Sequence, residues 1–411
     1  MLSGFRALDL TDEKGFLCGK ILGDLGTDVI KVERPGGDLA RNVGPFYHDI
    51  PSPEKSLYWF AFNNNKRGIT LNIETVDGKE IFKKLVKSAD FVIESFPPGY
   101  MDRLGLDYLV LSEINPRVIV TSITPFGQTG PYKDYKAADI VLLGMGGLQA
   151  FSGDPDRPPV RISFPQAYLH AGAEAAQGTM VAHYYRETTG EGQHVDVSAE
   201  ESMVWCLSSF RPWWEFQKTN PRREGPFRGD MFTGVVIRMI WPCQDGHVMF
   251  SVLGGQIGAR RNRALVDWMD SEGLASDFLK KMDWEALDLR TVTSEVMDSI
   301  MNPIADFFMA HTKAELYAGS RKRGIMLYPV SNVKDAVEDP QLTARGFWEE
   351  VEHPELGATI TYPGAFIKLT QTPCRIRRRA PLIGEHNVEI YKKELGLSRE
   401  ELVLLKQGGV I

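Results

Sequence analysis

Cysteine is scarce in this sequence, and the four thiols are scattered at Cys18, Cys206, Cys243 and Cys374 without a Cys-x-x-Cys pair. Isolated thiols argue against a disulfide framework and against a zinc site built from thiolates, and they favour a reducing compartment. The chain also lacks a run of about 18 apolar residues and a basic, apolar N-terminal leader. We therefore expect a cytoplasmic protein without a membrane span.

Several familiar functional motifs are absent as well. The loop after the first expected strand, TDEKGFLCG, lacks the G-x-G-x-x-G pattern, which argues against a nicotinamide or flavin dinucleotide site. P-loop, HExxH, GxSxG and EF-hand patterns are missing, and the eight histidines are dispersed, so we expect no metal site. A net charge of −7 argues against a nucleic-acid partner. Glu33, at the end of the second expected strand, is interpreted as an acid in water.

What the sequence does contain is an alternation of apolar strands and helices over its first 200 residues. We expect strands at 6–10, 27–33, 90–95, 117–123 and 193–198, and helices at 15–26, 78–89, 170–186 and 199–217. Continuous apolar strands that alternate with helices are typical of parallel pairing. The prediction is an α/β fold with a doubly wound sheet. Trp213 and Trp214, near the end of this block, are interpreted as buried core residues.

The composition changes near residue 220, where the polar, Gly- and Pro-containing stretch NPRREGPFRGD predicts a linker. Two apolar runs around Asp245-Gly246 then predict a β-hairpin, and helical segments continue to about 323. A tail from about 330 predicts short strands around HPELGA and two helices at 386–395 and 398–407. Ser398 and Glu401 form the pattern of a capping box at the start of the last helix. The expected domains are 1–220, 221–330 and 331–411.

Cationic side chains follow several of the expected strands. Arg34 lies in VERPGGD, Arg103 in FPPGYMDRLGL, and Lys133 and Lys136 in TGPYKDYKAAD. Open α/β sheets bind ligands at the carboxyl ends of their strands. Together these loops favour a polyanionic ligand, such as a nucleotide or its pantetheine derivative, although each cation taken singly fits a solvated surface.

A family resemblance covers almost the whole chain in order. It is carried by LGTDVIKVERPGGD, NNNKRGITLN, FPPGYMDRLGLDY, TPFGQTGPYKDY, GEGQHVDVS and the closing APLIGEH and GGVI. These stretches resemble the class III CoA-transferases, the family of formyl-CoA transferase and carnitine CoA-transferase. The resemblance implies a large Rossmann-like domain built from both chain ends, a small α+β middle domain and two interlocked chains. It also implies a CoA thioester as substrate and no tightly bound cofactor.

The resemblance assigns a CoA site residue by residue. Family positions that hold the nucleotide and phosphates match Arg34, Arg103 and Lys136. Leu71 matches a position that lines the adenine site. Ser95 stands where an Asn is common, and Phe96 follows it. The resemblance therefore implies CoA binding by Arg34, Leu71, Ser95, Phe96, Arg103 and Lys136.

The nucleophile of the family is missing. Transferases of this class use an Asp to attack the acyl-CoA thioester, and FPQAYLHAG places Tyr168 at that position. A phenol with a reference pKa of about 10 is mostly protonated at pH 7 and does not replace a carboxylate in this chemistry. A flexible Gly-rich loop of active members corresponds here to FRGDMFTG, with only Gly229 and Gly234. The His and Asp of the racemase branch fall on Ala138 and Tyr168.

We therefore expect a supporting subunit of a heteromeric transferase, paired with a homologous subunit that carries the Asp. The heteromeric branch that moves CoA between succinyl-CoA and benzylsuccinate in anaerobic toluene degradation is the most similar. A self-sufficient transferase with a displaced carboxylate, Asp154, Asp156 or Glu174, stays open. So do a CoA-ester binding protein without turnover and an isomerase or lyase on the same fold.

Overall fold

The computed structural model describes residues 1–229 and 235–411, and this part of the chain divides into two compact units. The first comprises Met1–Gln149, Arg161–Lys218 and Gln341–Ile411. The second comprises Ala150–Val160 and Thr219–Pro340. The first unit is therefore assembled from both ends of the chain, and each unit is described by itself below.

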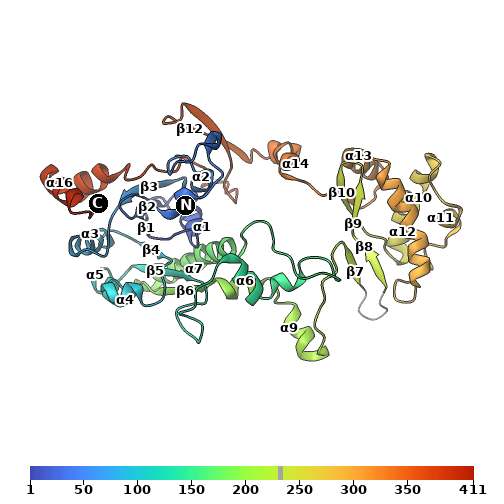
Figure 1. The fold of residues 1–411 in the computed structure, drawn as a ribbon, viewed down its shortest axis with the longest axis horizontal. Coiled ribbons are helices and arrows are strands. Elements are labelled where there is room, and N and C mark those ends of the chain that lie inside the picture. The colour runs from blue at the N-terminus through green and yellow to red at the C-terminus, as the bar shows by residue number, and fades with distance from the viewer. Residues whose placement is uncertain (230–234) are drawn as a thin grey trace. The chain divides into compact units, whose positions relative to one another are not determined.

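A six-stranded sheet forms the centre of the first unit (Figure 1). Its strands are β1 Arg6–Asp9, β2 Asp28–Glu33, β3 Lys66–Thr70, β4 Phe91–Glu94, β5 Ile119–Thr124 and β6 His194–Ser198. All neighbours pair in parallel, in the order β3-β2-β1-β4-β5-β6. This is the strand order of a doubly wound Rossmann-like sheet. The predicted α/β class with a parallel sheet is confirmed.

Helices cover both faces of the sheet because alternate strand residues point to opposite sides. Ala7 packs with the helices of one face, and Leu8 packs with those of the other. The first group is α1 Phe16–Asp24, α6 Asp139–Met145, α7 Ala167–Thr189 and α8 Ala199–Trp205. The second is α3 Val76–Val86, α4 Tyr100–Leu104, α5 Tyr108–Ile114 and the short helix η5 Val388–Glu394. The expected helix at 199–217 is wrong in length, since α8 ends at Trp205 and two short pieces follow, α9 Phe210–Pro212 and η4 Trp213–Gln217.

Strand β3 was not among the expected strands, and its polar sequence explains why. Lys66 begins it and is fully buried, with its ammonium 2.8 Å from the Asp9 carboxylate of β1. Lys31 lies on the other side of the same carboxylate, at 3.6 Å. Although burial acts to raise the pKa of Asp9, the two ammonium groups hold it down at about 2. A charge that is matched only across strands cannot be recognised from local periodicity.

The C-terminal segment closes the first unit by packing on the strands of the N-terminal half. The carbonyl of Pro381 accepts hydrogen bonds from Trp59 (3.1 Å) and Arg41 (2.9 Å). Tyr391 donates to the carbonyl of Thr70 at 2.7 Å.

The remaining elements outside the second unit's core are the following. They include α2 Leu57–Asn63, the hairpin β12 Trp348–His353 and β13 Ala358–Pro363, and α16 Arg399–Gln407, whose predicted capping box is confirmed. The short helices η1 Leu39–Asn42, η2 Tyr47–Asp49, η3 Leu148–Phe151 and α15 Pro340–Ala344 complete the connections.

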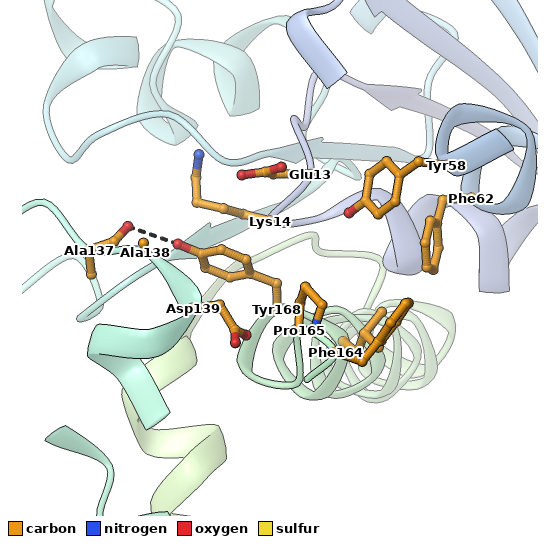
Figure 2. Close-up of a pocket in the computed structure, with 11 residues that line it drawn as sticks. Glu13, Lys14, Tyr58, Phe62, Ala137, Ala138, Asp139, Phe164, Pro165 and Tyr168 are labelled. Carbon is orange, nitrogen blue, oxygen red and sulfur yellow. Dashed lines mark hydrogen bonds between the residues drawn. The ribbon is translucent and has the colours of Figure 1, made fainter. Parts of the chain in front are cut away.

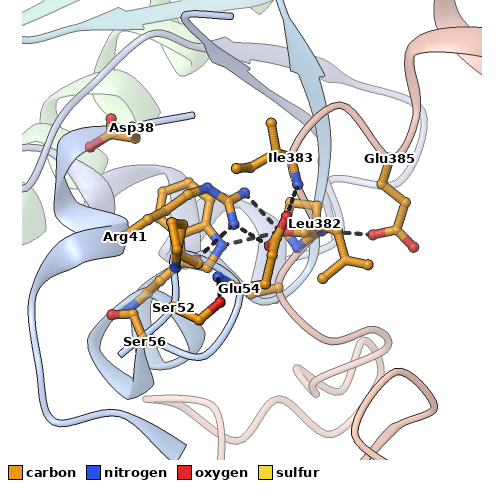
Figure 3. A network of polar contacts seen from close by, with 12 residues as sticks. Asp38, Arg41, Ser52, Glu54, Ser56, Leu382, Ile383 and Glu385 are labelled. Atoms are coloured by element: carbon orange, nitrogen blue, oxygen red, sulfur yellow. Dashed lines mark hydrogen bonds and ion pairs between the residues drawn. The ribbon is translucent and has the colours of Figure 1, made fainter. Parts of the chain in front are cut away.

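Two sequence-based expectations about burial are wrong. Glu33 is not an acid in water but is 2% exposed, because Arg41 donates to both of its carboxylate oxygens at 2.6 and 2.8 Å. Figure 3 shows Arg41 at the centre of this network, which Glu54 joins at 2.8 Å. Trp213 and Trp214 are not core residues but are 36% and 58% exposed. They follow α8 in short helical pieces that bury little.

The second unit contains the predicted hairpin. Strands β9 Ile240–Cys243 and β10 Gly246–Phe250 pair antiparallel around the turn at Asp245, and β11 Leu327–Pro329 extends the sheet. The helices of this unit are α10 Gly255–Ser271, α11 Asp277–Lys281, α12 Ser294–Met309, α13 Lys313–Arg323 and α14 Val333–Val337. Trp241, Trp284 and Phe307 fill their core. Strands β7 Phe227–Gly229 and β8 Val236–Arg238 flank residues 230–234, so Gly234 of the expected Gly-poor loop lies outside the described residues.

Candidate functional site

A cavity of ≈730 Å³, called here the strand-end cleft, opens where four parallel strands end. Its walls come from the loops after β1, β2, β3 and β4. The order of the strands reverses between β1 and β4, and such switch points are where open α/β sheets bind ligands. The fold thus forms a ligand-sized cleft at the expected edge of the sheet.

Four of the six residues expected to bind CoA line this cleft: Arg34, Leu71, Ser95 and Phe96. Leu71 is buried after β3, and its backbone N–H donates to the carbonyl of Glu33 at 2.7 Å. Ser95, 3% exposed, donates its hydroxyl proton to Asp12 at 2.8 Å and accepts the Asp12 N–H at the same distance. Ser95 therefore joins the loops after β1 and β4 across the switch point.

The other two expected residues lie outside the lining of the cleft. Arg103, on α4, holds its guanidinium carbon 5.7 Å from the centroid of the Tyr100 ring, and Tyr100 itself lines the cleft. Lys136 is exposed in the loop before α6, directly before residues of the second cavity described below. The structure brings Arg34, Leu71, Ser95 and Phe96 together in the lining of the cleft, whereas Arg103 and Lys136 do not line it.

An aromatic pair in the cleft was not anticipated from the sequence. The rings of Phe96 and Tyr100 stack with centroids 4.5 Å apart. Tyr100 donates a 2.6 Å hydrogen bond to Glu74, and partial burial together with that carboxylate raises the pKa of Tyr100 to about 12. Stacked rings beside the apolar side chain of Leu71 offer a surface for a flat heterocycle.

A buried titratable group holds the loop that carries Phe96. Glu94, the last residue of β4, is 3% exposed and accepts the backbone N–H of Phe96 at 2.7 Å. Burial raises the pKa of Glu94 to about 7, against the effect of its hydrogen bonds to Ser122 and Phe96. The loop that carries Phe96 is therefore fixed to a carboxyl group that titrates near neutral pH.

A second cavity of ≈310 Å³, called the Tyr168 pocket, lies beside the start of α7. Figure 2 shows Tyr58 and Phe62 on one side, Tyr168 and Asp139 on the other, and Glu13 and Lys14 along the edge. The remaining lining residues are Ala137, Ala138, Phe164, Pro165 and Leu169. Glu13 and Lys14 also line the strand-end cleft, so the two cavities share these two residues.

Tyr168 is fixed within its own fold. Its hydroxyl donates a 2.9 Å hydrogen bond to the carbonyl of Ala137, and the residue is 9% exposed. Burial and the nearby carboxylates of Asp12, Glu13 and Asp139 raise the pKa of Tyr168 above its ordinary value. A neutral phenol that donates its proton to a backbone carbonyl is a poor nucleophile at neutral pH.

Asp139, the first residue of α6, accepts hydrogen bonds from the N-terminus of α7. One carboxylate oxygen accepts the backbone N–H groups of Gln166 and Ala167, both at 2.8 Å. These amides would otherwise be unpaired donors at the positive end of a helix dipole. The loop of residues 137–139 is thus joined to α7 both here and through Tyr168.

The displaced carboxylates considered from the sequence do not line the Tyr168 pocket. Asp154 and Asp156 belong to the second compact unit. Glu174, on α7, accepts a short hydrogen bond from Ser202 of α8. The carboxylates that do line the pocket are Glu13 and Asp139, which sequence reasoning missed; the charged run in TDEKG was the signal that could have found Glu13.

Metal and membrane features are absent from the part of the chain described. No group of three or more His, Cys, Asp or Glu side chains there could hold a metal ion. None of the helices described is both long and apolar enough to cross a bilayer.

The family follows from comparison with known proteins. The model of CoA-transferase family III matches residues 2–387, and the chain belongs to this family. Its relatives include subunit BbsE of succinyl-CoA:(R)-benzylsuccinate CoA-transferase from Thauera aromatica, 35% identical over 99% of this chain and 98% of that protein. The formyl-CoA:oxalate CoA-transferase of Streptomyces avermitilis is 33% identical over 100% and 99% of the two chains. Because its relatives are CoA-transferases, the chain is a CoA-transferase or a subunit of one.

Two further relatives bear on subunit composition and fold. The beta subunit of succinyl-CoA–L-malate CoA-transferase from Chloroflexus aurantiacus is 30% identical over 100% of this chain and 98% of that one. Among solved structures, a CAIB/BAIF family protein from Brucella suis superimposes with a TM-score of 0.79 at 28% identity, covering 95% of this chain and 98% of the other. The similarity thus extends over both compact units.

Proposed function

We propose that this chain is the supporting subunit of a heteromeric family III CoA-transferase. The complex would move CoA between succinyl-CoA and an organic acid, an aryl-substituted dicarboxylic acid, with the nucleophilic Asp supplied by a homologous subunit. The observation that carries the proposal is the hydrogen bond from the Tyr168 hydroxyl to the carbonyl of Ala137, because the family resemblance puts Tyr168 at the position of the nucleophilic Asp. The names of two relatives, one a subunit for benzylsuccinate and one a beta subunit, support a heteromer.

An exposed apolar surface of the first unit supports the proposal of a partner chain. Apolar side chains on α6, α8 and the pieces that follow α8 are exposed, among them Val141, Trp205, Trp214 and Phe216. Exposed tryptophan and phenylalanine side chains are typical of protein interfaces. We propose that a homologous chain covers them, in the interlocked arrangement that the family resemblance implies. Four free cysteines agree with our proposal of a cytoplasmic location.

The strand-end cleft is our proposed CoA site. Leu71, Phe96 and Tyr100 suit the adenine. Arg34, which lines the cleft, and Arg103, which lies over the ring of Tyr100, suit the phosphates. Lys136 is proposed to contact the ligand from the loop before α6. CoA is here a substrate thioester, and we propose no resident cofactor.

The test is CoA exchange between succinyl-CoA and arylsuccinates by the chain alone and with its co-expressed Asp-bearing homologue. Activity only in the mixture, lost when the homologue's Asp is replaced by Asn, is the expected result. Activity of the chain alone would contradict the proposal and favour a self-sufficient transferase. CoA binding without exchange in either preparation would favour a CoA-ester binding protein.

A further inference from the structure

Aromatic side chains form much of the wall of the Tyr168 pocket. Tyr58, Phe62, Phe164 and Tyr168 contribute four rings, and those of Tyr58 and Phe62 lie 5.0 Å apart at 55°. Burial raises the pKa of both Tyr58 and Tyr168, so their phenols stay protonated at neutral pH. Such walls can place edges and faces of rings around an inserted aromatic group.

The pocket is lined by more acidic than basic side chains. Glu13 and Asp139 contribute two carboxylates, and Lys14 contributes one ammonium group. Lys14 is already paired with the carboxylate of Asp12. One oxygen of Asp139 is occupied by the N–H groups at the start of α7, which leaves its other oxygen for the pocket. A negatively charged ligand tail would meet like charges without a free cation to offset them.

The position of the pocket connects it to the strand-end cleft. Glu13 and Lys14 line both cavities, and both lie in the loop directly after β1. A thioester whose nucleotide occupies the cleft could extend its acyl group past these residues to the four rings. The volume of ≈310 Å³ is at the small end of the range of pockets that hold small ligands.

We propose, building on the CoA site proposed above, that the Tyr168 pocket of this chain selects the acyl group: it admits the neutral aryl ring of an acyl-CoA and rejects an acyl chain that ends in a carboxylate. Tyr168 then serves as a wall of a binding site, in addition to being a lost nucleophile. For an aryl-substituted dicarboxylic acid, the ring enters the pocket and the free carboxylate stays outside it. The succinyl group of the donor is left to the partner subunit.

The proposal is tested by calorimetric titration of the full-length chain with unreactive CoA thioethers. One carries a phenylpropyl group, a second carries a carboxypropyl group, and CoA itself is the reference. We expect the phenylpropyl compound to bind at least tenfold more tightly than CoA, and the carboxypropyl compound to bind no more tightly than CoA. Equal affinities of the two thioethers would overturn the proposal.

Variants of the pocket distinguish the contribution of its aromatic rings to ligand selectivity from that of its charged side chains. Phe62→Ala and Phe164→Ala should each reduce about tenfold the ratio by which the phenylpropyl compound binds more tightly than CoA. Phe216 is exposed and lies outside the pocket, so Phe216→Ala should leave that ratio unchanged. Glu13→Gln should improve binding of the carboxypropyl compound severalfold relative to that of CoA measured with the same variant. Unaltered selectivity in the Phe62, Phe164 and Glu13 variants would also overturn the proposal.

The same titration distinguishes this inference from the proposed function. If CoA binds and the two thioethers do not differ, only the acyl preference fails, and exchange by the heteromer is untouched. If CoA itself does not bind, the CoA site proposed for this chain fails, and the acyl preference fails with it.

Discussion

The hydroxyl of Tyr168 donates a 2.9 Å hydrogen bond to the carbonyl oxygen of Ala137. The family resemblance puts Tyr168 at the position of the nucleophilic Asp. The bond joins the start of α7 to the loop before α6, which Asp139 also anchors. Under the proposed function, this hydrogen bond is a structural contact and Tyr168 has no chemical role.

Tyr168→Phe tests that contact. The substitution keeps the ring and removes the hydroxyl, leaving the Ala137 carbonyl without this donor, which should cost about 1 kcal/mol of folding free energy. Exchange by the heteromer should be unchanged, because the phenol takes no part in it. Thermal unfolding and the exchange assay measure the two effects, with Tyr184→Phe, on the exposed side of α7, as the control. A tenfold fall in exchange rate would assign Tyr168 a catalytic role and contradict the account.

The buried pair of Arg41 and Glu33 predicts a large stability effect. Arg41→Met leaves the Glu33 carboxylate in a site where it is 2% exposed, and removing one partner of a buried pair costs about 3–5 kcal/mol. Arg41→Lys should lower the free energy of unfolding by less, since it retains the positive charge and loses only the bidentate hydrogen bonding to the Glu33 carboxylate. Urea unfolding measures both, and Arg117→Ala, which breaks an exposed pair with Glu187, should change stability by less than about 1 kcal/mol. A similar small change for Arg41→Met would count against this network.

Glu94 predicts a pH dependence of stability. Its pKa in the folded chain is about 7, above the ordinary 4.5, so between these values the folded state binds more protons than the unfolded state. Stability should therefore fall as pH rises from about 4.5 to 7, by about 3 kcal/mol from this group. Glu94→Gln should lack that component, so that its stability relative to the parent increases with pH. Parallel stability curves from pH 4.5 to 7.5 would show that Glu94 does not titrate in this way.

The cations at the strand-end cleft predict the affinity for CoA. Arg34→Gln and Arg103→Gln should each weaken CoA binding about tenfold, equivalent to about 1.4 kcal/mol, by removing a charged contact to a phosphate. The difference from the parent should shrink at high salt. Lys83→Ala, on the outer side of α3, is the matched control. Unchanged affinity in both Arg variants would place CoA elsewhere.

Much of the fold could be predicted because the decisive signals are local. The alternation of apolar strands and helices specifies the parallel sheet, and the carboxyl ends of parallel strands share one edge. For that reason Arg34, Ser95 and Phe96, which end or follow expected strands, line one cleft, whereas Leu71 follows the unexpected strand β3 and was indicated only by the family resemblance. Ser398 and Glu401 form their capping box for a similar reason, since all its groups lie within one turn.

The failures have a physical cause in contacts between distant segments. Glu33 is buried because the guanidinium of Arg41 lies against it, held in turn by the Pro381 carbonyl from the other end of the chain. Lys66 can be the first residue of β3 because the carboxylate of Asp9, on β1, neutralises its ammonium group. Tyr58 comes to the Tyr168 pocket from α2, far away in sequence. Contacts between residues so far apart in the chain leave no periodic pattern in a single sequence.

Intact-mass analysis after incubation with succinyl-CoA tests the central claim most directly. This chain and the proposed Asp-bearing homologue are mixed in equal amounts, quenched during turnover and separated, and the mass of each chain is measured. The account predicts a covalent CoA adduct on the homologue and an unmodified mass for this chain. A CoA adduct on this chain, in the mixture or alone, would show that it carries a nucleophile of its own and contradict the account.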